Sequence, residues 1–119
     1  MAIGRNTTIL VVGALGACAA SPESIPPSYI SPVVFQNWTC EQLSAEGYRL
    51  AAATAQASSR QEQAVTNDTV GVLLLGLPLG SMSGQNIAPE LGKLKGEHEA
   101  VYRVAVEKKC PVAETSSIR

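Results

Sequence analysis

The sequence predicts an all-α fold, an antiparallel helical hairpin formed by residues 37–110. Three observations support this prediction. Apolar and small residues recur at alternating three- and four-residue steps in one stretch of the chain, and again in a second stretch near the C-terminus, which is the spacing of one face of a helix. A segment rich in Gly and Leu separates the two stretches. A cysteine lies at the outer end of each stretch.

The first predicted helix begins near Asn37, where Thr39 is a suitable N-cap and Glu41 places negative charge at the positive end of the helix dipole. Its inward face consists of Cys40, Leu43, Gly47, Leu50, Thr54, Ala57, Gln61 and Ala64. Many of these side chains are small, so a partner helix can approach closely, although each contact buries little area. Residues 67–69, Asn-Asp-Thr, favour a turn, and the helix is expected to break there.

Residues 70–84 form the most apolar part of the chain after the N-terminal region and are expected to connect the two helices. Gly76, Gly80 and Gly84 are spaced by four, which on a helix resembles a glycine zipper, although Pro78 would remove one helical hydrogen bond. Two interpretations remain open. The segment is either the self-packed end of the hairpin or a patch that contacts a membrane or a partner.

The second predicted helix runs from about Ile87 or Pro89 to Lys109, and Pro89 suits its first turn. Its inward face consists of Leu91, Leu94, His98, Val101 and Ala105. Pro111 is expected to end the helix, and residues 111–119 are expected to form a polar tail.

Residues 1–17 have the pattern of a signal peptide, in which Arg5 precedes the apolar run 9–17. The run of about nine residues is much shorter than the roughly 20 that a spanning helix needs. Residues 15–18, Leu-Gly-Ala-Cys, resemble a bacterial lipobox, which implies that Cys18 is acylated and becomes the first residue of the mature chain. The alternative is an ordinary cleaved secretory signal, because Cys18 lies between two alanines and these small residues also suit a different signal peptidase.

Residues 18–36 are expected to form a lipidated tether outside the core, because Pro22, Pro26, Pro27 and Pro32 favour extended backbone. At about 3.1 Å per residue, such a tether would hold the hairpin on the order of 40 Å from a bilayer. The aromatic residues near its end, Tyr29, Phe35 and Trp38, are expected to pack on the hairpin.

Cys40 and Cys110 are predicted to form a disulfide in an oxidising compartment, the alternative being two unpaired thiols. The bridge requires their Cα atoms to lie within roughly 7 Å of each other. Two helices of equal length, with a break near residues 67–68, satisfy this requirement most simply.

No catalytic, metal-binding or cofactor-binding residues are predicted, and we expect the chain not to be an enzyme. His98 is the single histidine, which leaves no multi-histidine metal site and no convincing nucleophile–histidine arrangement. The chain has 9 Lys and Arg against 10 Asp and Glu, with a net charge of −1. It therefore lacks the basic field that a nucleic-acid partner would require.

Several motifs together resemble a group of small proteobacterial lipoproteins of uncharacterised function. These motifs are the lipobox at 15–18, Tyr-Ile-Ser-Pro at 29–32, Cys40 with Gln42-Leu43, Arg49-Leu50, Leu-Lys-Gly-Glu at 94–97 and Lys-Cys at 109–110. The resemblance implies an envelope protein held by membrane lipid through acylated (palmitate-bearing) Cys18.

The expected function is a structural or interaction role with an envelope protein partner, at the periplasmic face of the outer membrane. Inner-membrane retention of lipoproteins resembles a rule that prefers Asp directly after the lipidated cysteine. Ala19 follows Cys18 here, so the outer membrane is favoured. The alternative function is that of a membrane-active or self-associating protein, which acts through residues 70–84.

Overall fold

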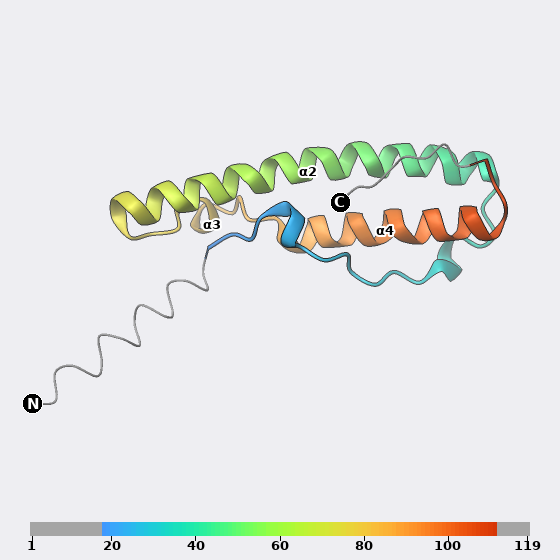
Figure 1. The fold of residues 1–119 in the computed structure, drawn as a ribbon, viewed down its shortest axis with the longest axis horizontal. Coiled ribbons are helices and arrows are strands. Elements are labelled where there is room, and N and C mark those ends of the chain that lie inside the picture. The colour runs from blue at the N-terminus through green and yellow to red at the C-terminus, as the bar shows by residue number, and fades with distance from the viewer. Residues whose placement is uncertain (1–17, 112–119) are drawn as a thin grey trace, which may run out of the picture.

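Three α-helices and two short 3-10 turns, joined by loops, are present in residues 18–111, the part of the chain that the computed structural model describes (Figure 1). The helices are α2 (Cys40–Leu75), α3 (Leu79–Met82) and α4 (Ala88–Glu107), and the turns are η1 (Pro22–Ser24) and η2 (Pro32–Phe35). The long helices α2 and α4 pack side by side, which confirms the predicted all-α hairpin. The predicted signal peptide 1–17 and most of the polar tail lie outside the described residues.

Helix α2 begins at the predicted cap and is longer than predicted. Thr39 and Gln42 form a reciprocal capping box, in which each side chain accepts the backbone N–H of the other residue. The helix then continues for 36 residues, about 54 Å, to Gly76, whose left-handed backbone ends it.

The predicted break near residues 67–68 is wrong, because the polar side chains in this stretch find partners that leave the helix intact. The Thr66 and Thr69 hydroxyls donate to carbonyls one turn earlier in the same helix. Asp68 faces inward and accepts hydrogen bonds from other segments. The threonine hydroxyls and the Asp68 carboxylate therefore do not compete with the backbone hydrogen bonds of the helix.

Helix α3 and the loop after it fold back along the last turns of α2 (Figure 1). They fill the length by which α2, with 36 residues, exceeds α4, with 20. Cys40 and Cys110 meet at the opposite end of the hairpin, with their Sγ atoms 2.05 Å and their Cα atoms 5.5 Å apart. The predicted pairing is therefore confirmed, whereas the equal helix lengths argued from it are wrong.

The three glycines of the middle segment do not form a zipper. Gly76 and Gly84 have φ angles of 72° and 78° and belong to turns, so they share no helix face with Gly80. A Cβ atom at Gly80 would lie 2.6 Å from the Ala64 carbonyl oxygen. Gly80 therefore allows α3 to lie directly against α2.

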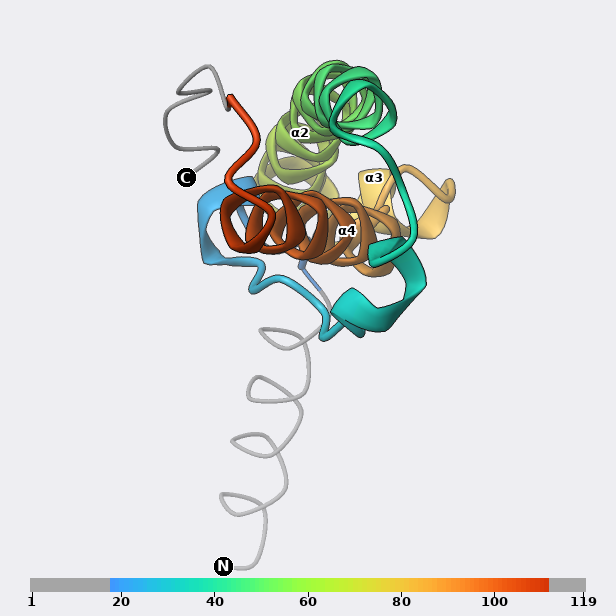
Figure 2. The same ribbon diagram turned by 90° about the vertical axis from the view of Figure 1, so that its right-hand side faces the viewer.

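The N-terminal segment, residues 19–35, packs along α4, and the expectation that it forms a tether outside the core is wrong. Figure 2 shows the later part of this segment passing along the side of α4 that faces away from α2, whereas its first residues also reach α2. Ile25 and Phe35 are buried, each in one of the two apolar clusters of the hairpin. Phe35 also contacts Trp38 edge to face, as expected, whereas Tyr29 is exposed.

Two glycines of α4 allow this close packing. A Cβ atom at Gly92 would lie 3.2 Å from the Pro26 carbonyl oxygen, and one at Gly96 would collide with the Ser28 carbonyl. The Ser28 N–H donates to the Gly92 carbonyl oxygen at 2.8 Å. A second buried face of α4, which the sequence pattern does not predict, comprises Gly92, Lys95, Gly96, Ala100 and Val104.

Candidate anchor site at the apolar end of the hairpin

A buried carboxylate joins the start of the described chain to the far end of the hairpin. Asp68, on α2, is only 1% exposed. Its Oδ2 accepts the N–H of Ala19 at 2.6 Å, and its Oδ1 accepts the N–H of Ser81 at 2.6 Å. The Ser81 hydroxyl donates to the same carboxylate. Asp68 therefore fixes the residue next to Cys18 beside α3.

Two further buried polar side chains hold the residues that follow. Gln61 donates from Nε2 to the Ala20 carbonyl oxygen at 2.9 Å, while its Oε1 accepts the Ile87 N–H at 2.8 Å. Lys95 donates from Nζ to the carbonyl oxygens of Pro22 and Ile25. We call Asp68, Gln61 and Lys95 the N-terminal clamp, because together they bind residues 19–25 to both long helices.

The environment of Asp68 stabilises its charged form. Burial acts to raise the pKa of Asp68, but hydrogen bonds from the Ser81 hydroxyl and from the backbone N–H groups of Ser81, Ala19 and Gly80 outweigh it. The pKa of Asp68 therefore lies below its ordinary value. The carboxylate is ionised at neutral pH, when it accepts all of these bonds.

Asp68→Asn is expected to lower the free energy of unfolding by roughly 2–3 kcal/mol at pH 7, because hydrogen bonds to a charged group are lost inside the fold. A group with a depressed folded pKa stabilises the fold above its unfolded pKa, about 3.9 for Asp. This stability is lost as the pH falls through the lower, folded value. The unfolding free energies of the two proteins, measured by urea titration from pH 7 down to pH 2, should therefore converge at the acid end. A constant difference would contradict the assignment.

Cys18, the predicted lipidation residue, is exposed and unpaired, in contrast to Cys40 and Cys110. Its backbone continues directly into Ala19, whose N–H is bound by Asp68. The structure thus brings the predicted modification residue to the α3 end of the hairpin, and it leaves the thiol accessible.

The α3 end of the hairpin also carries the largest group of exposed apolar side chains. We call this group the apolar tip; it consists of Val70, Val72, Leu73, Leu74, Leu75, Leu77, Leu79 and Met82. No charged residue occurs in the sequence between Asp68 and Glu90. Contiguous exposed apolar surface of this kind marks contact with another molecule or with lipid.

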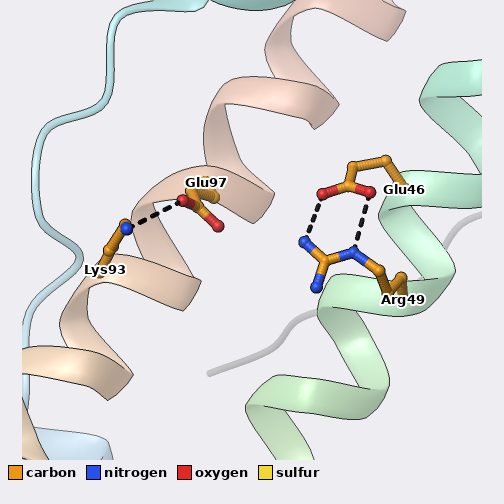
Figure 3. A network of polar contacts seen from close by, with 4 residues as sticks. All are labelled: Glu46, Arg49, Lys93 and Glu97. Carbon is orange, nitrogen blue, oxygen red and sulfur yellow. Dashed lines mark hydrogen bonds and ion pairs between the residues drawn. The ribbon is translucent and has the colours of Figure 1, made fainter.

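The charged side chains occur instead on the rest of the hairpin, and Figure 3 shows two ion pairs there, one on α2 and one on α4. Arg49 Nε donates to Glu46 at 2.9 Å, and this hydrogen bond lowers the pKa of Glu46. Lys93 lies 3.8 Å from Glu97. Exposed pairs of this kind contribute little to stability, but they mark this region as one that faces water.

The disulfide end has a small hollow of about 40 Å³, lined by residues that include Tyr48, His98 and Tyr102. Burial lowers the pKa of His98, which favours the neutral imidazole.

Within residues 18–111, no three His, Cys, Asp or Glu side chains lie together as a metal site would require. None of the described helices is long and apolar enough to cross a membrane.

The sequence does not predict the role of the three clamp residues. The sequence predicts Gln61 on the inward face of the first helix and Asp68 in a turn, and Lys95 belongs to a motif that carries the resemblance. The sequence feature that indicates buried polar contacts is the pair Gln61 and Asp68, which are spaced by seven on an otherwise apolar or small-residue face.

Comparison of the chain with protein-family models, curated proteins and solved structures found no match.

Proposed function

We propose that this chain is an envelope lipoprotein, held by lipid on Cys18, with a structural or interaction role at the periplasmic face of the outer membrane. The observation that carries the proposal is the lipobox-like sequence at 15–18 together with the exposed, unpaired thiol of Cys18. The bridged pair Cys40 and Cys110 agrees with a disulfide-forming compartment such as the periplasm. An envelope protein is the proposed partner of the hairpin.

Mass spectrometry of the N-terminal peptide tests the lipid anchor. The mature protein, purified from bacterial membranes, is expected to begin at Cys18 and to carry the mass of two or three acyl chains there. Cys18→Ser is expected to leave the precursor uncut or to move the protein out of the membrane fraction. A matched Cys40→Ser/Cys110→Ser variant should remain acylated. An unmodified mature chain that begins elsewhere would overturn the proposal.

The exposed leucines of the apolar tip favour a second candidate function, that of a membrane-active or self-associating protein. Such a protein would not associate through a helix face of spaced glycines, because Gly76 and Gly84 lie in turns. Dye leakage from liposomes treated with the Cys18→Ser protein would favour membrane activity. Intact liposomes with monomeric protein would favour the lipoprotein with a structural role.

A further inference from the structure

We propose that Cys18 and the apolar tip form one membrane-docking surface, which places the α3 end of the hairpin in a lipid bilayer and points the disulfide end away from it. The inference rests on the proposed acylation of Cys18. It adds the part of the fold that meets the lipid and the orientation that follows.

The N-terminal clamp fixes the distance between the anchor and the tip. Asp68 binds the N–H of the residue that follows Cys18. Leu73 and Leu75 lie five and seven residues beyond Asp68 on α2, which is roughly 7.5–10.5 Å along the helix. Ser81, which also binds Asp68, is the neighbour of Met82 in α3. Measured along the α2 axis from Asp68, the end of the tip therefore lies about 10 Å away, less than the roughly 15 Å depth of one hydrocarbon leaflet.

The shape of the tip favours lipid over the flat surface of a protein. Leu73, Leu74 and Leu75 are 79%, 76% and 65% exposed. Consecutive residues point about 100° apart around a helix, so apolar surface surrounds most of the helix end. A partner protein docked on one face would cover only part of this surface, whereas a fluid bilayer that receives the helix end-on covers all of it.

The charge distribution agrees with this orientation. The segment between Asp68 and Glu90 has no charged side chain, and Asp68 itself is buried with its hydrogen bonds satisfied. Immersing the tip therefore removes no exposed charge from water, which would otherwise be costly. The ion pairs of Figure 3 lie further toward the disulfide end, where the proposed orientation leaves them in water.

Depth-sensitive fluorescence tests the docking. The full chain is produced with its own N-terminal sequence, purified and reconstituted into phosphatidylethanolamine–phosphatidylglycerol vesicles. Leu74→Cys carries an environment-sensitive fluorophore at the tip, and Tyr48→Cys is the matched control at an exposed position of α2 near the disulfide. With Cys18 acylated and the other two cysteines bridged, each variant has one reactive thiol. Circular dichroism checks that both remain helical, and Met82→Cys provides a second tip position.

We expect blue-shifted emission at the Leu74 and Met82 positions, with quenching by nitroxide-labelled lipid, and water-like emission at the Tyr48 position, with quenching by aqueous iodide. Water-like emission at all three positions would overturn the inference. Blue-shifted tip emission without quenching by lipid would also overturn it, because a second copy of the chain would then cover the tip. The acyl mass on Cys18, read from the same sample, separates failure of the proposed function from failure of the docking.

Discussion

Replacing both bridged cysteines, Cys40→Ser/Cys110→Ser, is expected to lower the free energy of unfolding by about 4 kcal/mol, because the bridge closes a long loop in the unfolded chain. The two cysteines are separated by 70 residues. They join the first residue of α2 to the chain just after α4, so the bridge encloses the whole hairpin. An effect of this size is comparable with the entire stability of many small domains. Urea unfolding followed by circular dichroism measures it.

The matched control is Cys18→Ser, which removes an exposed thiol that has no partner. The bridged protein and the Cys40→Ser/Cys110→Ser variant are both made with Cys18→Ser, so that neither carries lipid when their unfolding free energies are compared. The control itself is expected to change the unfolding free energy by less than about 0.5 kcal/mol, as for an ordinary surface substitution. A double variant as stable as its background would show that the thiols are not paired in the native protein.

Gly96→Ala is expected to destabilise the protein by roughly 2–3 kcal/mol, a large effect for the addition of one methyl group. The added Cβ would collide with the backbone carbonyl of Ser28, which cannot move without shifting the N-terminal segment on α4. The hydrogen bond from Ser28 to Gly92 and the bonds of Lys95 would then be strained or lost. Thermal unfolding measures the loss, and limited proteolysis should cut residues 26–30 faster than in the parent.

Gly47→Ala is the control with the opposite expected sign. A Cβ atom at Gly47 meets nothing within 4 Å, and the residue lies inside α2. Alanine there is expected to stabilise the protein by about 0.5–1 kcal/mol through its better helix propensity. Equal effects of the two substitutions would show that helix propensity alone, and not the contact with Ser28, determines the cost at Gly96.

Local patterns in the sequence predicted the parts of the fold that local chemistry decides. The cap at Thr39, the inward face of α2 from Leu43 to Ala64, and the start of α4 near Pro89 follow from hydrogen bonding and periodicity within a few residues. The pairing of Cys40 with Cys110 followed from their positions at the outer ends of two helical stretches.

The parts that were missed depend on contacts between residues far apart in the chain. Asp68 has the side chain of a turn residue, but its partners Ala19 and Ser81 keep it inside a helix. The prolines of residues 22–32 favour extended backbone wherever they occur, and only the glycine surface of α4 makes a packed position available to them. Local propensity cannot reveal a partner 49 residues away.

The clamp can form only late in the synthesis of the chain, because its three side chains come from the two long helices. Ala20, Ala19 and Pro22 are bound by residues 41, 49 and 73 positions later in the chain. The first residues of the described segment therefore have no docking site until α2, and then α4, have been synthesised. An enzyme that acts on Cys18 before α4 is complete therefore meets a chain end that the clamp does not yet hold.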